Sequence, residues 1–241
     1  MSKTFAELGI PFPLFEANSD QASEYCGELI CSFCNAERQH CFRLKISCAI
    51  ISKCSNCATA NGLDVVDRED RPCRQCRTLV RFPEFDDEIV ACYSCLRAGK
   101  AAMTKDTEIG MVSCDQAFEG VTHGIPDLAR SDFEMVPKAE GWVGARLSSA
   151  IMFELLRTPS YRSIQGEKWQ FCCAEPMVYV GEWSREEFNR RSPNGDGKRH
   201  FEKIVQDCIL GLWENKLHDS TGVYVFRCPR CIRMTAHWDI A

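Results

Sequence analysis

The sequence predicts an α+β protein in which an N-terminal zinc-ribbon module with nested Cys₄ sites precedes a mixed, largely antiparallel sheet with packed helices. The first observation is that the 241-residue chain has 17 cysteines, many of them in Cys-x-x-Cys pairs. The second is that strand-like and helix-like segments follow without a strict β-α-β alternation. We therefore expect two domains, a zinc-ribbon module at residues 1–105 and an α+β domain at residues 106–241.

The cysteine pairs of the first domain have the spacing of zinc knuckles, in which two sulfurs point at one metal from about 2.3 Å. Residues 1–16 contain no apolar run long enough for a secretory signal, so we expect a cytoplasmic chain. In a reducing compartment, repeated Cys-x-x-Cys pairs favour metal binding over disulfides, and a thioredoxin-like motif would need only one pair. The predicted ligands of two structural Zn²⁺ ions are Cys31, Cys34, Cys54, Cys57, Cys73, Cys76, Cys92 and Cys95.

The pairs can combine either in sequence order or nested, and spacing alone leaves both arrangements open. The two inner pairs read as Cys-x₂-Cys-x₁₅-Cys-x₂-Cys from Cys54 to Cys76, which is the spacing of a self-contained zinc ribbon. We favour nesting, with this inner ribbon inserted at about residues 47–85. Cys92 and Cys95 would then lead into a short helix at residues 96–103, near the predicted domain boundary.

The second domain is predicted from periodicity and capping residues. Ser148 or Ser149 can cap a helix that ends at Thr158-Pro159, and Ser184 with Glu187 forms a capping-box pattern. Apolar residues from Phe201 to Trp213 recur every three or four positions, which predicts an amphipathic helix. Gly- and Asn-rich residues 193–197 predict a surface loop. Strands are predicted at residues 133–136, 169–173, 177–183 and 222–226.

The last predicted strand leads to a C-terminal Cys-x-x-Cys knuckle, Cys228 and Cys231, which has no obvious partner pair. We take Cys173 as its further ligand and thus as part of a candidate third zinc site. Cys172 next to it, His237 and Asp239 are alternatives for the fourth position, although two adjacent cysteines reach one metal only with a strained backbone. The alternative is that these are ordinary thiols in a knuckle-like turn.

The net charge and the hydropathy of the chain restrict the kinds of partner that we expect it to bind. The formal net charge is −5, and thiolates that bind zinc make it more negative. This charge disfavours non-specific nucleic-acid binding and suits a basic protein partner. No apolar stretch is long enough to span a bilayer, so no membrane partner is expected.

Several segments of the chain contain recognisable short motifs: Phe12–Phe15, the pairs Cys31/Cys34 and Cys92/Cys95, Ala98–Ala102, Leu155–Pro159, Gln165 with Trp169 and Cys173, Tyr224–Cys231, and His237–Asp239. Together they resemble the CbrC family, also called the colicin-tolerance family. The resemblance covers most of the chain outside about residues 47–85, which agrees with nesting, but Cys172 and Glu175 stand where that family has His and Asp. The resemblance implies a bacterial immunity protein linked to tolerance of a nuclease toxin.

Three functions are hypotheses that these observations support. The first, favoured by the resemblance and the negative charge, is an immunity protein that binds and neutralises a toxin through an acidic surface. The second is a zinc-ribbon module in a nucleic-acid or transcription-related complex, which the arginines of the inner ribbon favour. The third is a zinc enzyme with a site near Cys173, Cys228 and Cys231, together with Arg157, Trp169 and Glu175. No nucleophile and base stand at a recognisable spacing, so we expect a protein that is not an enzyme.

Overall fold

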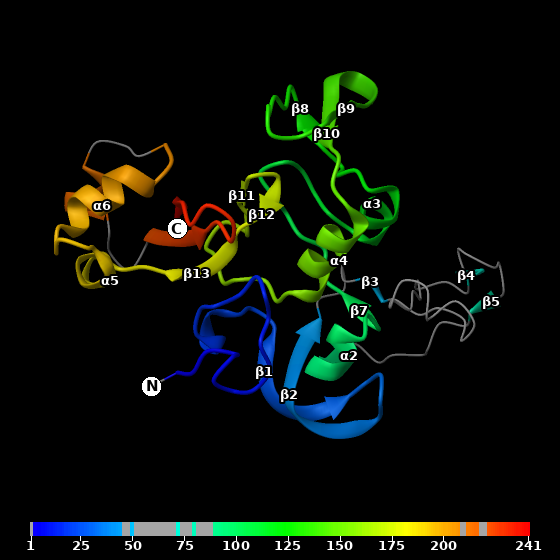
Figure 1. The fold of residues 1–241 in the computed structure, drawn as a ribbon. Helices are drawn as coiled ribbons and strands as arrows, with labels where there is room; N and C mark the ends of the chain where they lie inside the picture. Colours follow the sequence, from blue (N-terminus) through cyan, green and yellow to red (C-terminus); the bar gives the residue numbers. More distant parts are fainter. Residues whose placement is uncertain are drawn as a thin grey trace. The chain divides into compact units, whose positions relative to one another are not determined.

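The computed structural model describes residues 2–44, 49–50, 71–72, 79–80, 89–207, 211–216 and 221–241 (Figure 1). The chain forms two compact units. One consists of Met1–Ala22 and Tyr161–Ala241, and the other of Ser23–Ser160. These units do not coincide with the predicted division near residue 105, because the first 22 residues pack with the C-terminal third of the chain.

The Ser23–Ser160 unit begins with an antiparallel sheet of order β1-β2-β6, formed by Tyr25–Cys31, Ala36–Leu44 and Ile89–Cys92. Helix α2 (Tyr93–Arg97) follows β6 directly, where the sequence predicts a helix at residues 96–103. The predicted helix is therefore misplaced by three residues at its start, because the second cysteine of the pair lies within the helix. Short strand pairs join β3 (Ala49–Ile50) to β7 (Ala101–Ala102), and β4 (Arg71–Pro72) to β5 (Leu79–Val80).

The rest of this unit contains two helices and a second small sheet. Helix α3 (Cys114–Glu119) has a capping box formed by Ser113 and Gln116. The predicted Ser148 cap is confirmed, since its hydroxyl accepts the Ile151 N–H at 3.3 Å and α4 runs from Ser149 to Arg157. The second sheet has the antiparallel order β8-β10-β9 and is formed by Ile125–Pro126, Trp142–Ala145 and Met135–Pro137, with a 3₁₀ turn at Ala139–Gly141.

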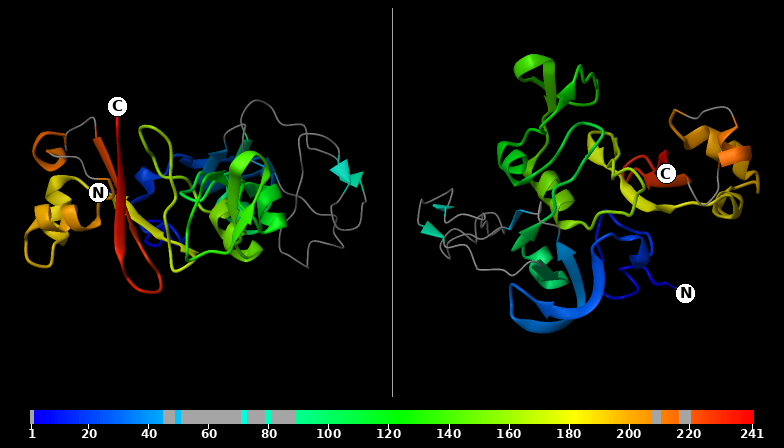
Figure 2. Two further views of the ribbon diagram at one scale, coloured as in Figure 1. Left: turned by 90° about the horizontal axis from the view of Figure 1, so that it is seen from above. Right: turned by 180° about the vertical axis from the view of Figure 1, so that it is seen from behind.

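The other unit is built on an antiparallel sheet of order β13-β14-β15, in which β14 and β15 form the C-terminal hairpin (Figures 1 and 2). These strands are Val178–Glu182, Thr221–Arg227 and Met234–Ile240. A separate two-stranded hairpin consists of β11 (Phe171–Cys172) and β12 (Glu175–Pro176). A 3₁₀ turn at Ser19–Gln21 belongs to the N-terminal segment.

Helices α5 (Arg185–Arg191) and α6 (Gly197–Ile204) pack against each other beside this sheet. The predicted Ser184 cap is confirmed by its contact with the Glu187 N–H at 3.3 Å. The predicted helix from Phe201 to Trp213 is wrong in length: α6 begins earlier, at the Asp196 cap, and ends at Ile204. It ends there because Val205 pairs with β15, where the Gln206 N–H donates to the Ala236 carbonyl at 2.8 Å. A π-helical turn follows at Leu212–Lys216.

The core of this unit is aromatic. The ring of Tyr161 is stacked on that of Tyr179 with centroids 4.7 Å apart, and the Trp169 indole N–H donates to the Met177 carbonyl at 2.9 Å. Phe15 of the N-terminal segment lies against Tyr179 at 5.1 Å, which is how residues 1–22 join this unit. A second cluster forms where α5 and α6 meet the sheet, and its buried members are Trp183, Phe188, Phe201, Ile204, Val205, Leu212, Val223, Val225 and Ala236.

The predicted fold class is confirmed at the level of an α+β protein with antiparallel sheets. Whether the N-terminal region is a zinc ribbon is not decided by this topology. The inner ribbon predicted at residues 47–85 lies almost entirely outside the described residues. Among the described helices, none combines the length and the apolarity that are needed to cross a membrane.

Candidate metal centres

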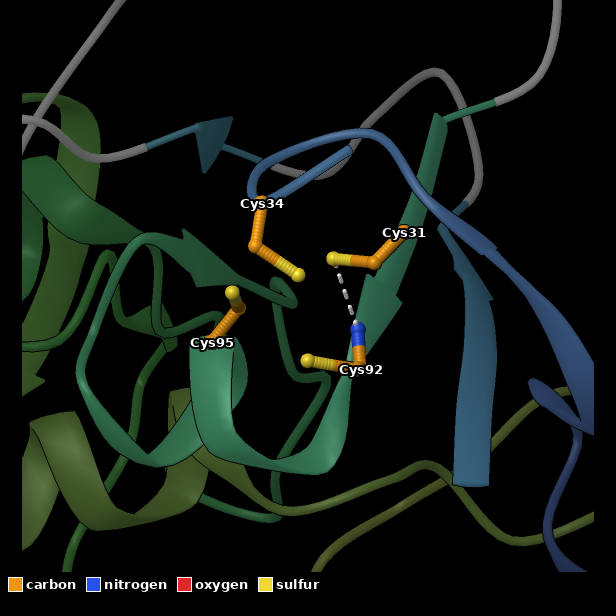
Figure 3. A group of neighbouring side chains, drawn as sticks. All are labelled: Cys31, Cys34, Cys92 and Cys95. Atoms are coloured by element: carbon orange, nitrogen blue, oxygen red, sulfur yellow. Dashed lines mark hydrogen bonds between the residues drawn. The ribbon is translucent and has the colours of Figure 1, made fainter. Parts of the chain in front are cut away.

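Two groups of four cysteines in the described part of the chain bring their sulfurs together, and each can hold a metal ion. The first consists of Cys31, Cys34, Cys92 and Cys95, and all four Sγ atoms lie within 4.8 Å of one another. Figure 3 shows the four side chains pointing toward a common centre. Cys31 ends β1, Cys34 lies in the turn to β2, Cys92 ends β6, and Cys95 is in α2.

Local backbone geometry aims these side chains inward. Asn35 adopts a left-handed conformation with φ 48°, and its N–H donates to the Cys31 carbonyl at 2.8 Å, which closes a tight turn around the first pair. The Val90 N–H donates to the Ser32 hydroxyl at 3.0 Å, so this turn is attached to β6. The Cys92 N–H donates to the Cys31 sulfur at 3.3 Å (Figure 3). Sulfurs that accept backbone N–H groups are stabilised as thiolates, the form that binds metals.

The first group is buried. Cys31, Cys92 and Cys95 are at most 4% exposed, and Cys34 is half-buried. The pKa of Cys31 is lowered to about 4, first because the Cys95 thiol donates a hydrogen bond to it and then because backbone N–H groups do. The pKa of Cys95 is raised, because it is that donor and because burial disfavours its charge. Thiolates at all four positions would need a bound cation to balance their charge.

The second group consists of Cys172, Cys173, Cys228 and Cys231, whose Sγ atoms also lie within 4.8 Å of one another. The Sγ of Cys172 is 3.8 Å from that of Cys173 and 3.6 Å from that of Cys231. A tetrahedral ion with metal–sulfur bonds of about 2.3 Å separates its sulfurs by about 3.8 Å, whereas a disulfide bond is about 2.05 Å long. The observed separations match the edges of a metal-centred tetrahedron.

The four cysteines of the second group lie in or next to two tight turns. Cys173 and Ala174 both have φ 56° and form the two-residue turn of the β11–β12 hairpin, which places the adjacent cysteines on one side. The strained backbone that the sequence indicates for this arrangement is thus present. In the β14–β15 connection, the Cys228 N–H donates to the Arg233 carbonyl at 2.8 Å, and Ile232 has φ 56°.

The cysteines of the second group are more exposed to solvent than those of the first group. Cys173 and Cys231 are exposed, Cys172 is half-buried and Cys228 is buried. The pKa of Cys231 is lowered to about 7, chiefly because the Arg233 N–H donates to its sulfur. Arg230 and Glu175 form an ion pair that joins the two turns, and this pair also lowers the pKa of Glu175.

The structure decides how the predicted ligands are combined. Cys31 and Cys34 meet Cys92 and Cys95, which is the outer pairing that the nested arrangement requires. The inner ligands Cys54, Cys57, Cys73 and Cys76 lie outside the described residues. Cys173, Cys228 and Cys231 lie together as predicted, and Cys172 joins them although it was only an alternative in the prediction. The signal for Cys172 in the sequence was its position next to Cys173.

The other two alternatives for the fourth ligand have different partners. His237 Nε2 is hydrogen-bonded to the Tyr161 hydroxyl at 2.7 Å, and the Tyr224 hydroxyl donates to Asp239 at 2.8 Å. The candidate enzyme residues Trp169 and Glu175 also have structural contacts, with the Met177 carbonyl and with Arg230. None of these residues lies in either sulfur group.

Cys41 shows how a buried thiol of this chain behaves outside the two groups. Its Sγ donates to the Leu29 and Arg38 carbonyls, each at 3.4 Å. Burial raises the pKa of Cys41 to about 11, so it stays protonated. Cys41 is therefore a buried, protonated thiol with which the cysteines of the two sulfur groups can be compared.

A family model described as "Uncharacterised protein family (UPF0167)" matches residues 45–240. The match includes the second sulfur group and Cys92 with Cys95, and it begins after Cys31 and Cys34. The resemblance to the CbrC family inferred from short motifs is therefore wrong, because the match that extends over most of the chain is to a different family.

One curated relative is "UPF0167 protein PA1536" from Pseudomonas aeruginosa, which is 30% identical over 89 residues. These residues are 35% of this chain and 47% of that protein, so the match spans about half of the relative's length. No solved structure matches this chain.

Proposed function

The chain belongs to the uncharacterised UPF0167 family, and we propose that it is a zinc-binding protein whose two sulfur groups each hold one structural Zn²⁺. One observation carries the proposal: the sulfurs of Cys31, Cys34, Cys92 and Cys95 converge from two segments that are about sixty residues apart. Metal-free, this convergence would place four polarisable and partly ionised groups in a mostly buried space, where the exposed guanidinium of Arg38 beside Cys34 offsets their charge only from one side.

Zinc is the ion that suits this donor set best. Four thiolates in a tetrahedron form a closed site, with no position left for water or substrate, and this is the arrangement of structural rather than catalytic zinc. Soft thiolate ligands disfavour Mg²⁺ and Ca²⁺, which prefer oxygen. Because a reducing compartment keeps cysteines as free thiols, the proposed Cys₄ sites agree with the predicted cytoplasmic location.

The proposed role of the first ion is to close the sheet of the Ser23–Ser160 unit. It would tie the β1–β2 turn to the junction of β6 and α2. Structural zinc contributes roughly 10–16 kcal/mol of apparent binding free energy in zinc-finger peptides. Burial of Phe42, Leu44, Ile89 and Val90 in the same sheet contributes a comparable amount, at about 1.5–3 kcal/mol per side chain.

The toxin-immunity hypothesis keeps only part of its support. Its link to a nuclease toxin rested on the CbrC resemblance, which the family match overturns. The net charge of −5 still supports a proposal that the partner has a basic surface. Among the described residues, no contact specifically favours the nucleic-acid hypothesis or the enzyme hypothesis.

The test is metal analysis of the full chain purified without chelators. Zinc per chain would be measured by mass spectrometry for the wild type, for Cys31→Ser/Cys34→Ser and for Cys172→Ser/Cys228→Ser. We expect each double variant to lose one equivalent of zinc relative to the wild type. The matched control is Cys41→Ser, which removes a buried cysteine outside both groups and should keep the full zinc content.

Cobalt substitution identifies the ligands independently, because tetrahedral Co²⁺ bound to four thiolates has characteristic charge-transfer and d–d absorption bands. A wild-type protein that contains no zinc and gives no such bands would overturn the proposal. Equal zinc content in Cys31→Ser/Cys34→Ser and in Cys41→Ser would remove the first site from it.

A further inference from the structure

The two sulfur groups differ most in their exposure to solvent. In the first group three of the sulfurs belong to residues that are at most 4% exposed, and Val90, Leu29 and Phe33 pack around them. In the second group Cys173 and Cys231 are exposed, since each lies in a tight turn outside its strands. A small polar oxidant can therefore reach Cys173 and Cys231 directly, whereas in the first group only the half-buried Cys34 is partly accessible.

We propose that the second group is an oxidation-sensitive zinc site, in which a peroxide joins Cys172 to Cys231 and releases the ion while the first site keeps its own. This inference rests on the proposed zinc-binding function. It assigns different roles to two sites with the same ligand set: the buried one is permanent, and the exposed one responds to the redox state of its surroundings.

The chemistry balances with hydrogen peroxide as the oxidant. The exposed Cys231 thiolate attacks one peroxide oxygen, the O–O bond breaks, and a sulfenic acid and one hydroxide ion are formed. The Cys172 thiolate then attacks the Cys231 sulfur, forms the S–S bond and displaces a second hydroxide ion. In total two thiolates lose two electrons and one peroxide gains them. The ion, left with two thiolate ligands, passes to water or to a competing chelator.

Geometry favours this pair of sulfurs. The Sγ atoms of Cys172 and Cys231 are 3.6 Å apart and belong to two separate hairpins, so an S–S bond of about 2.05 Å requires them to approach each other by about 1.5 Å. Cys172 and Cys173 are neighbours in sequence, so a bond between them would distort the peptide that joins them. Cys228 is buried, and its sulfur accepts the Cys231 N–H at 3.5 Å, which leaves it less accessible.

The surroundings make the step reversible. The ion pair between Arg230 and Glu175 joins the same two turns without using a sulfur, so the turns stay adjacent after the ion leaves. The β14–β15 hairpin that supports Cys228 and Cys231 is paired along its whole length, from Thr221 with Ile240 to Arg227 with Met234. Reduction of the disulfide would therefore restore the ligand set in place.

The experiment uses the zinc-loaded full chain with hydrogen peroxide and a chromophoric zinc chelator. Zinc release is followed in time, and samples are alkylated and mapped by mass spectrometry to determine which cysteines have been oxidised. We expect Cys172 and Cys231 to be lost at least about ten-fold faster than Cys31, Cys34, Cys92 and Cys95. A Cys172–Cys231 disulfide peptide should accompany the release, and a thiol reductant with added zinc should reverse both.

Two variants test the assignment further. Cys231→His keeps a zinc ligand of the Cys₃His type but cannot form the disulfide, so its second site should release zinc more slowly than the wild type. Cys34→His is the matched change at the first site and should leave the release from the second site unchanged.

Equal rates of oxidation in the two groups of a zinc-loaded protein, or faster oxidation of the first group, would overturn the inference and leave the proposed function intact. A protein without zinc would instead refute the proposed function itself. These two failures are therefore distinguishable in the same sample.

Discussion

Tyr161→Phe tests whether one buried hydroxyl holds together the segment that follows Pro159 and the C-terminal strand. Tyr161 is 1% exposed. Its hydroxyl accepts the backbone N–H of Lys168 and is hydrogen-bonded to Nε2 of His237 at 2.7 Å. The substitution removes that single oxygen and leaves the ring in its stack against Tyr179.

The expected loss comes from the two groups that lose their partner. A buried polar group left without a hydrogen bond costs about 1–3 kcal/mol. The Lys168 N–H belongs to an exposed residue and can recruit water, so it contributes at the low end of this range. His237 Nε2 lies on a half-buried ring whose pKa is lowered by burial, so it contributes more than the Lys168 N–H. We therefore expect Tyr161→Phe to lower the free energy of unfolding by about 2–4 kcal/mol.

The assay is urea unfolding of the zinc-loaded protein followed by tryptophan fluorescence. Four of the five tryptophans, Trp169, Trp183, Trp213 and Trp238, lie in the unit that contains Tyr161, so the signal reports mainly on that unit. The matched control is Tyr179→Phe, which removes a hydroxyl from the adjacent ring. That hydroxyl donates only to Gln21 Oε1 at 3.1 Å, an atom that also accepts the Glu182 N–H at 3.0 Å.

Because no group is left unpaired in the control, we expect Tyr179→Phe to lower the free energy of unfolding by about 1 kcal/mol or less. Equal losses for the two variants would refute the reasoning. A loss below about 0.5 kcal/mol for Tyr161→Phe would show that water replaces the hydroxyl at both partners.

Two further predictions concern pH and backbone packing. Burial lowers the pKa of His237 to about 4 from its ordinary 6.5, so the unfolded chain binds a proton first and stability is lost as pH falls from about 6.5 to about 4. The free energy of unfolding changes by at most about 1.4 kcal/mol per pH unit in this range. Urea unfolding of the wild type and of His237→Gln at a series of pH values measures this contribution as the difference between the two proteins. The same pH dependence in both proteins would contradict the prediction. A Cβ on Gly124 would lie 2.4 Å from the Val143 carbonyl oxygen at φ 92°, whereas a Cβ on Gly141 at φ 78° would meet nothing within 4 Å. In thermal unfolding we expect Gly124→Ala to cost about 3 kcal/mol or more and Gly141→Ala about 1 kcal/mol; similar losses would show that the backbone at Gly124 adjusts freely.

The sequence predicted correctly those features that depend on interactions between residues close together in the chain. Ser148 and Ser184 cap helices because a hydroxyl reaches the N–H three residues ahead, whatever the rest of the chain does. The Cys-x-x-Cys spacing likewise determines that two sulfurs of one pair lie close together. The strand at residues 222–226 was recognisable because it is apolar along its whole length, and it is buried on both faces from Gly222 to Phe226.

Long-range packing decided the features that the sequence left open or misjudged. The helix predicted from Phe201 to Trp213 ends at Ile204 because Val205 forms a β-bridge with Ala236 of β15. The hydrophobic periodicity of the helix gives no information about that strand. The division into units differs from the predicted boundary because Phe15 packs on Tyr179, far away in the sequence. The short motifs that suggested the CbrC family were too few to identify it.

The sequence by itself determined that this protein has the donors for more than one tetrahedral metal site, since ligand type and pair spacing are local properties. Only the tertiary structure decided that Cys172 stands 3.6 Å from Cys231, a residue 59 positions away, and that this group is open to solvent while the other is buried. Which pairs meet, and what covers them, depends on where the chain turns back on itself, and those turns are set by contacts between residues that are distant in sequence.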